Sequence, residues 1–140
     1  MSRYRLSDDQ GEMQPAAIHA YLTRSYWAEN IPLALVERAV AGSLCVGVFD
    51  GAAQIGFARV VTDRATFAYL ADVYVLEDHR GHGLASRMVK HLHDHPELQG
   101  LRRWMLVTRD AQPLYAGLGW RGIEAPEGFM ERRFPDVYRQ

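Results

Sequence analysis

Residues 73–92 read VYVLEDHRGHGLASRMVKHL, and this stretch decides the fold. It begins as an apolar run typical of a strand and passes through a turn that contains two glycines. It then continues with Leu84, Met88 and Leu92 at the spacing of an amphipathic helix. Glycine permits positive φ angles, and the first turn of a helix leaves backbone N–H groups unpaired. The turn therefore predicts either a plain strand-to-helix connection or a phosphate site.

The segments around this stretch predict a mixed sheet with helices packed on it. The order read from the sequence is β-α-α-β-β-β-α-β-α-β, with a hairpin at Asp50-Gly51 and a helix that begins at Pro32. The outer strands of this order are YRLS at residues 4–7, RRWMLVT at 102–108 and EGFMERRF at 127–134. Strands that are not regularly alternated with helices favour an α+β fold in one domain, residues 1–140.

Composition narrows the function classes. Lys and Arg together number 16 and Asp and Glu 17, so broad electrostatic binding of nucleic acid is not expected. No apolar run is long enough to span a bilayer, and the N-terminus lacks the apolar core of a signal peptide. We therefore expect a cytoplasmic protein that binds neither nucleic acid nor membrane, as a monomer or homodimer.

The cysteine and histidine content predicts no disulfide and no metal site. Cys45 is the single cysteine and lies in an apolar run, where it reads as a buried hydrophobe. His91, His93 and His95 end a helix, but spacing places no third ligand on the face that His91 and His95 share.

The turn matches one phosphate-binding pattern better than others. The patterns G-x-x-x-x-G-K-S/T and G-x-G-x-x-G with a downstream acid both fit poorly. Arg80-x-x-Gly83-x-Ala85 instead resembles the acetyl-CoA-binding motif Gln/Arg-x-x-Gly-x-Gly/Ala of the GNAT superfamily of N-acetyltransferases. A second resemblance lies in TRDAQPLYAGLGW, residues 108–120, in which the family positions are Ala111, Tyr115, Gly119 and Trp120.

The resemblance implies a fold and a cofactor site. The fold is a GNAT-like, mostly antiparallel mixed sheet of six to seven strands with about four helices, whose strands splay around acetyl-CoA. Backbone groups of the strand before the turn would pair with pantetheine, and those of the turn would hold the pyrophosphate. The implied cofactor-binding residues are Val73, Tyr74, Val75, Arg80, Gly81, His82, Gly83, Leu84, Ala85, Ser86 and Thr108. Thr108 departs from the family, which often has Asn there.

Two residues are candidates for catalysis. By resemblance, Tyr115 would donate a hydrogen bond to the departing CoA sulfur. Asp72, a carboxylate that interrupts an apolar strand, is the candidate general base for the attacking amine, in competition with Glu77, His79 and a relayed water.

The acceptor is expected near SYWAENIP, residues 25–32, where Tyr26 and Trp27 would either line a pocket or cover a core. The resemblance thus implies an acetyl-CoA-dependent N-acetyltransferase without a metal. It would act on a small-molecule amine, less readily on a peptide, by direct transfer in a ternary complex. A non-catalytic acyl-CoA-binding sensor of the same fold is the alternative, and a nucleotide-binding module is a third.

Overall fold

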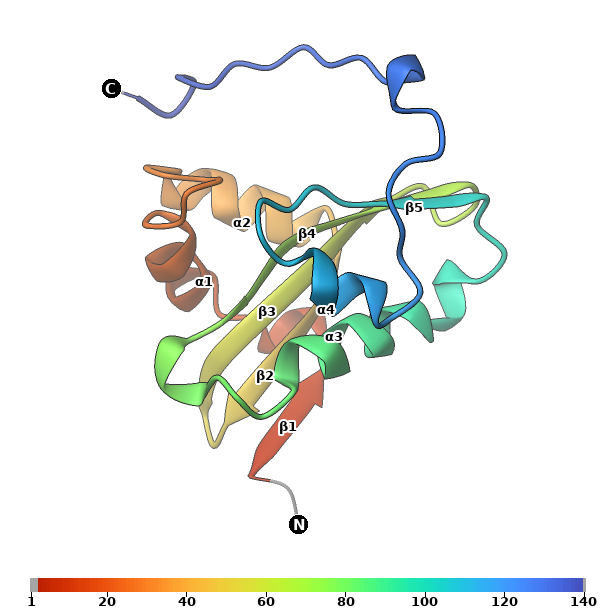
Figure 1. Cartoon of the computed structure of the whole chain (residues 1–140). Helices are drawn as coiled ribbons and strands as arrows, with labels where there is room; N and C mark the ends of the chain where they lie inside the picture. The colour runs from red at the N-terminus through yellow and green to blue at the C-terminus, as the bar shows by residue number, and fades with distance from the viewer. Residues whose placement is uncertain (1–2, 140) are drawn as a thin grey trace.

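The computed structural model describes residues 3–139, and its centre is a five-stranded sheet in the order β1-β2-β3-β4-β5 (Figure 1). The first four strands are antiparallel to their neighbours, whereas β5 runs parallel to β4. The expected mixed, mostly antiparallel α+β architecture is confirmed. The strands are β1 (Tyr4–Ser7), β2 (Leu44–Asp50), β3 (Ala53–Thr62), β4 (Phe67–Val75) and β5 (Arg103–Met105).

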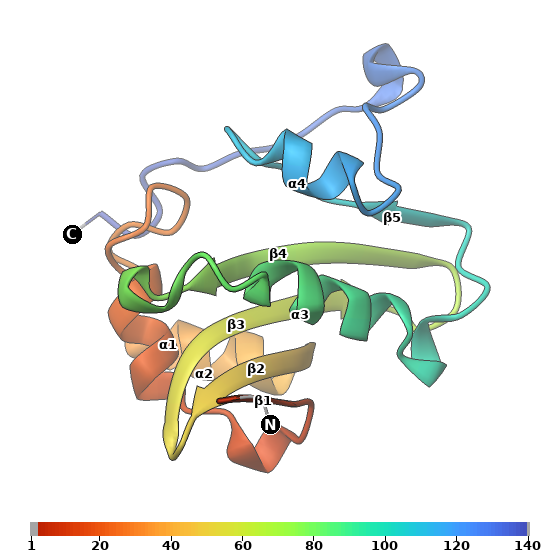
Figure 2. The same ribbon diagram turned by 60° about the horizontal axis from the view of Figure 1, so that its bottom comes forward.

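Helices cover both faces of the sheet (Figure 2). Helices α1 (Pro15–Leu22) and α2 (Leu33–Ala41) bury Ile18 and Val36 on one face. Helix α3 (Leu84–His93) packs Met88 and Leu92 on the other, beside the short α4 (Gln112–Ala116). The apolar spacing read from the sequence is therefore the buried stripe of α3. Short 3-10 turns lie at Gln10–Glu12, Glu77–His79, Pro96–Leu98 and Pro126–Gly128.

Strands β4 and β5 part soon after they meet. Their pairing joins Phe67–Tyr69 to Arg103–Met105 only, so the second half of β4 has no partner in β5. The parting opens the sheet at the end of β4, where the 73–92 stretch turns toward α3 (Figure 1).

The predicted boundaries hold for most elements. The hairpin turns at Gly51, whose φ is +61°, and α2 follows Pro32 and ends at Gly42. The strand expected over 102–108 is shorter, since β5 ends at Met105.

The strand expected over 127–134 is wrong, and the described residues contain five strands rather than six to seven. Four of those eight residues are charged, Glu127, Glu131, Arg132 and Arg133, so the segment offers few of the apolar or β-branched residues that strands favour. Its start is taken up by a 3-10 turn instead.

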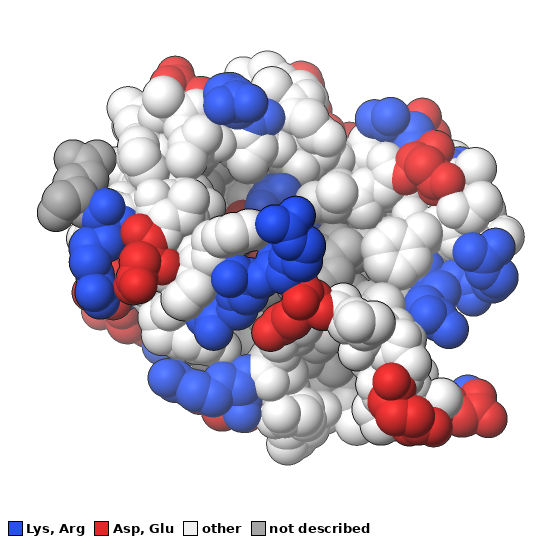
Figure 3. All heavy atoms as spheres, turned by 90° about the horizontal axis from the view of Figure 1, so that it is seen from above, with Lys and Arg blue, Asp and Glu red and all other residues white. Residues whose placement is uncertain are grey.

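The surface carries both signs of charge. On the face shown in Figure 3, Lys and Arg lie beside Asp and Glu and do not form a continuous single-sign surface. Within residues 3–139, no helix has both the length and the apolar character needed to cross a bilayer.

Candidate functional site

A cavity of about 650 Å³ lies where β4 and β5 part. Its walls come from the end of β4, the turn before α3, the loop between α1 and α2, and the start of α4. Most of the residues singled out in the sequence meet here, although they are far apart in the chain. The predicted residues that line it are Tyr26, Trp27, Val73, Tyr74, Val75, Arg80, Gly81, Gly83, Leu84, Ala85, Ser86 and Tyr115.

Three predicted site residues do not line this cavity. His82 instead places its ring 5.5 Å from the ring of Tyr4. Thr108 accepts the backbone N–H of Ala111 at 3.1 Å through its hydroxyl, and thereby orients the chain that enters α4. Asp72 is held in an ion pair described below. None of these three residues is part of the cavity lining.

The turn before α3 presents its backbone to the cavity. Gly81 and Gly83 have φ angles of +86° and +70°, which L-residues with a Cβ rarely adopt. Arg80 closes the turn onto β4, because its Nε donates to the carbonyl of Val75 at 2.9 Å. A second nitrogen of Arg80 donates to the hydroxyl of Tyr21 at 3.0 Å. Arg80 therefore shapes the turn.

Helix α3 begins without a side-chain cap. Its N-cap is Gly83, no side chain bonds to the first turn, and that turn contains no acidic residue. The unpaired N–H groups and the helix dipole therefore give this end a partial positive charge with nothing of the protein's own to satisfy it. The positive-φ turn and the bare helix end together suit an anionic ligand.

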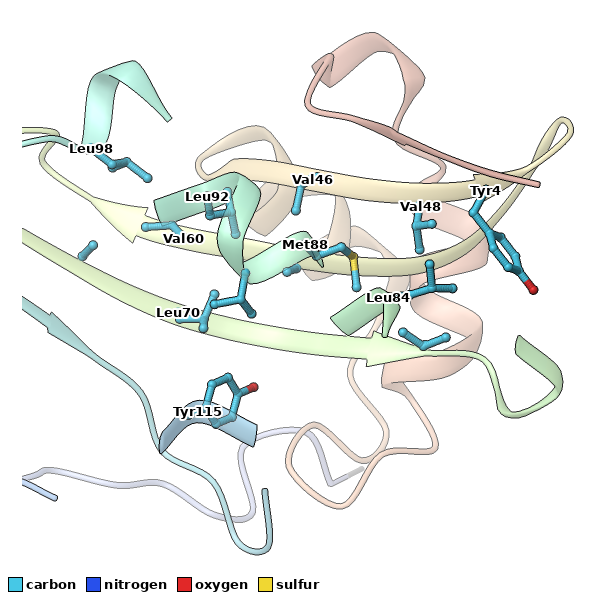
Figure 4. Packing of buried hydrophobic residues seen from close by; sticks show 14 of the residues in the cluster. Tyr4, Val46, Val48, Val60, Leu70, Leu84, Met88, Leu92, Leu98 and Tyr115 are labelled. Carbon is cyan, nitrogen blue, oxygen red and sulfur yellow. The ribbon is translucent and has the colours of Figure 1, made fainter. Parts of the chain in front are cut away.

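Tyr115 lies across the cavity from this helix end. Its ring projects from α4 beside β4, and the side chain is only 8% exposed (Figure 4). The hydroxyl makes no side-chain hydrogen bond within residues 3–139, so its proton is available to a ligand. Burial, with a smaller contribution from Tyr26, raises the pKa of Tyr115 and keeps the phenol protonated at neutral pH.

Asp72 has an unusual backbone and two partners. Its φ is +57°, at a bulge where Asp72 and Val73 together lie opposite Ala58. One carboxylate oxygen accepts the Nε–H of Arg59 at 2.5 Å, and the other accepts the indole N–H of Trp27 at 2.8 Å. Because both oxygens are held and the side chain does not line the cavity, the geometry does not favour Asp72 as the general base.

The other candidate bases differ in how free they are. Glu77 lines the cavity but pairs through both oxygens with Arg24, and this hydrogen-bonded pairing lowers the pKa of Glu77 to about 2. His79 also lines the cavity, and its Nδ1 lies 2.9 Å from the hydroxyl of Tyr4. This contact fixes the orientation of the His79 ring.

Several lining residues were missed by the sequence analysis. Tyr21 stacks on Tyr74 with ring centroids 4.1 Å apart, and Arg109 lies over the ring of Tyr26. Tyr21 was missed because its spacing is that of a core position on a helix. Arg109 was missed because the strand before it was predicted to run to residue 108, whereas β5 ends at Met105. The partner of Asp72 could have been suspected from the sequence, because Arg59 is the single charged residue in the apolar strand before the one that contains Asp72.

No metal centre is found in the described part of the chain, where no three His, Cys, Asp or Glu side chains gather as metal ligands would. The thiol of Cys45 is buried, and burial raises its pKa to about 12. Neither metal-activated water nor a cysteine nucleophile is suggested by this geometry.

Comparison with known proteins agrees with this arrangement. Residues 5–120 match the family model described as Acetyltransferase (GNAT) family. A protein of Gibberella zeae with a proposed acetyltransferase activity is 33% identical, over 89% of this chain and 83% of its own length. The chain belongs to the GNAT acetyltransferase family.

Solved structures of GNAT proteins give the same fold. A proposed GNAT acetyltransferase from Xanthomonas campestris pv. campestris is 45% identical, with a TM-score of 0.96 over 100% of this chain and 99% of that one. A Clostridium acetobutylicum protein solved with acetyl-CoA is 15% identical, with a TM-score of 0.64 over 93% of this chain and 94% of that one. At that identity the second likeness concerns the fold alone.

Proposed function

We propose that this GNAT protein is an N-acetyltransferase that moves an acetyl group from acetyl-CoA to the amine of a small molecule, by direct transfer in a ternary complex. The observation that carries the proposal is that a bare helix end, an unpaired strand edge and the phenol of Tyr115 all line one cavity. These are the three features that a thioester donor with a pyrophosphate requires.

The donor would bind along the turn and β4. The pyrophosphate would lie against backbone N–H groups from Gly81 to Ser86, where the helix end is bare. The pantetheine amides would pair with the backbone of Val73–Val75, because β5 leaves that part of β4 free. In this scheme the side chains of Val73 and Tyr74 have no direct role in the cofactor site.

The reaction would take place at the thioester end of the pantetheine chain. The nitrogen lone pair of the amine attacks the thioester carbonyl carbon, and the carbon–sulfur bond then breaks. A backbone N–H of residues 73–75 would stabilise the developing oxyanion. The hydroxyl of Tyr115 would donate a hydrogen bond to the departing sulfur, since a thiolate forms more readily beside a donor.

The amine must lose a proton to attack, because an alkyl ammonium has a pKa near 10. Glu77 is occupied by Arg24, and Asp72 by Arg59 and Trp27. We assign the proton to His79, directly or through one water, since imidazole is a common general base and that of His79 lines the cavity. Asp110, an exposed carboxylate on the opposite wall, is the competing base.

The acceptor would enter over the aromatic rim formed by Tyr26 and Trp27, which are 50% and 40% exposed. Aromatic rings favour a cationic amine before it loses its proton, and they also favour an apolar body behind the amine.

Two measurements test the proposal in sequence. Isothermal titration against acetyl-CoA, CoA and NAD should show binding of the first two, and binding of NAD alone would overturn it. A screen of amines, read by thiol release from acetyl-CoA, should then find an acceptor. Tight acetyl-CoA binding without turnover on any amine would instead support a non-catalytic acyl-CoA sensor.

The base is tested separately with matched variants. His79→Gln should lower kcat at least tenfold, whereas Asp110→Asn should leave kcat unchanged. The reverse result would assign the proton to Asp110.

A further inference from the structure

We propose that Asp72 is a positioning residue that holds the acceptor side of the cavity in place through the indole of Trp27. The inference rests on the proposed function in one respect, the assignment of this side of the cavity to the acceptor amine. Its structural part, the coupling of the sheet to residues 25–31, stands on the geometry alone.

The backbone at Asp72 is held in a conformation that it would not adopt freely. A positive φ is uncommon for a residue other than glycine, and it persists only where surrounding contacts enforce it. Here the enforcing contacts are the bulge against Ala58 and the ion pair with Arg59. The bulge turns the carboxylate toward Arg59 on β3 and toward the loop after α1.

The ion pair is well enclosed. The side chains of Asp72 and Arg59 are 10% and 19% exposed, and a guanidinium nitrogen of Arg59 also donates to the hydroxyl of Ser43 at 3.1 Å. Arg59 is thus anchored by two partners on different elements, and the carboxylate of Asp72 is fixed by it. The carboxylate oxygen that does not bind Arg59 is therefore held in a fixed position, where it can accept a hydrogen bond.

The indole of Trp27 forms a hydrogen bond to this oxygen. The indole N–H donates to Asp72 at 2.8 Å, while the ring packs edge-on against Tyr26, with centroids 5.1 Å apart. The loop has internal bonds, from the N–H of Ala28 to the hydroxyl of Ser25 and from that of Asn30 to the carbonyl of Thr23. None of these bonds ties it to the sheet. The Trp27–Asp72 bond does, and it helps to position the aromatic rim relative to β4, beside the contact of Tyr26 with Arg109 and the packing of Ala28 and Ile31 in the core.

A general-base role makes the opposite demand on the same carboxylate. A base must present an oxygen to the amine or to one water beside it. Asp72 directs one oxygen to each of two protein donors, and its side chain does not line the cavity. The two roles therefore predict different kinetics for the same substitution.

Three variants separate the possibilities. Trp27→Phe removes the indole donor and leaves the ion pair intact. Asp72→Asn keeps an oxygen for Trp27 and a side chain that tolerates positive φ, but it loses the charge that holds Arg59. Asp63→Asn is the control, because Asp63 accepts backbone N–H groups of residues 65–67 in the turn between β3 and β4, away from the cavity.

With an acceptor in hand, Trp27→Phe and Asp72→Asn should each raise the KM of the acceptor five- to twentyfold. The kcat should stay within threefold, and the Kd of acetyl-CoA should be unchanged. The effects should be less than additive in the double variant, since loss of the charge at Asp72 matters here through the position of the oxygen that Trp27 binds. Asp63→Asn should leave the KM unchanged. A hundredfold fall in kcat for Asp72→Asn alone, with an unchanged acceptor KM, would overturn the proposal in favour of a base.

Amide hydrogen exchange tests the structural part without an acceptor. Residues 25–31 should exchange faster in Trp27→Phe and in Asp72→Asn, but not in Asp63→Asn. Unchanged exchange would overturn the coupling even if the enzyme turns over. Faster exchange in a protein that acetylates no amine would retain the coupling and overturn the proposed function instead.

Discussion

The guanidinium of Arg109 lies 3.8 Å from the ring centroid of Tyr26, and the backbone N–H of Arg109 donates to the Tyr26 hydroxyl at 3.2 Å. These contacts join the loop between α1 and α2 to the chain between β5 and α4. The joined segments form opposite walls of the cavity, so one aromatic ring closes its rim.

Arg109→Ala should loosen this closure. An exposed cation–π contact contributes about 0.5–1 kcal/mol, so we expect a roughly two- to fivefold higher acceptor KM and an unchanged Kd for acetyl-CoA. Arg121→Ala is the control, because Arg121 pairs with Glu124 in an exposed position outside this cavity. An equal effect of both variants would show that the Tyr26 contact does not matter.

Tyr115→Phe should lower kcat while leaving acetyl-CoA binding intact. Loss of a hydrogen bond to a leaving group that becomes charged is expected to cost about one to two orders of magnitude in rate. Since burial raises the pKa of Tyr115, kcat of the wild type should show no alkaline fall from this residue in the neutral to mildly alkaline range. Steady-state rates between pH 6 and 9.5 check both points, and an unchanged kcat would remove Tyr115 from the mechanism.

Gly83→Ala should weaken acetyl-CoA binding about tenfold, because a Cβ in the left-handed region costs about 1–2 kcal/mol and the turn would relax away from its present backbone direction. No atom lies within 4 Å of the added Cβ, so strain rather than collision is tested. Gly51→Ala is matched, since its φ is +61° and its surroundings are equally open. Calorimetry should find weaker binding only for Gly83→Ala, although both variants lose stability.

Stability should fall as pH drops below about 6.5. His93 accepts the indole N–H of Trp120 at 3.1 Å, which requires a neutral imidazole, and burial lowers the pKa of His93 against a smaller opposing effect of Asp94. The stabilisation is therefore complete above the unfolded pKa and is lost as pH falls toward the folded one. Urea unfolding at pH 7 and pH 5.5 measures the change in the free energy of unfolding between the two pH values. This change should be smaller for His93→Gln than for the wild type, because glutamine does not titrate. An identical difference in both proteins would contradict this.

Cys45 should not react with thiol reagents in the folded protein. The side chain is 3% exposed, and burial raises its pKa to about 12. Disulfide-exchange reagents at pH 8 should label it only after urea unfolding. Rapid labelling of the native protein would show that the thiol is accessible.

The sequence predicts best where a local pattern is the structural cause. The helix of residues 84–93 followed from its apolar stripe, and the hairpin at Asp50-Gly51 from the turn preference of that pair. The strand over 127–134 failed because only tertiary pairing could have stabilised its charged residues, and β5 ends too early to supply an edge.

The site was predictable only in part, for a related reason. Backbone sites such as the turn at residues 81–86 are indicated by glycines, which local sequence shows. The contacts of Asp72 with Trp27 and Arg59 join three segments, and no local pattern reveals which partner a lone carboxylate will meet. A carboxylate in an apolar strand was predicted as a base, whereas the structure pairs both of its oxygens with other side chains.

The short pairing between β4 and β5 has a consequence for how the protein can be handled. Only three residue pairs join β5 to β4, so a ligand that lies along the free edge of β4 would take the place of a missing strand. Its binding energy then adds to the unfolding free energy of the fold, by about 2.7 kcal/mol at one hundred times the Kd. A melting-temperature screen of acyl-CoA thioesters would therefore rank acyl-chain preference before any acceptor is identified.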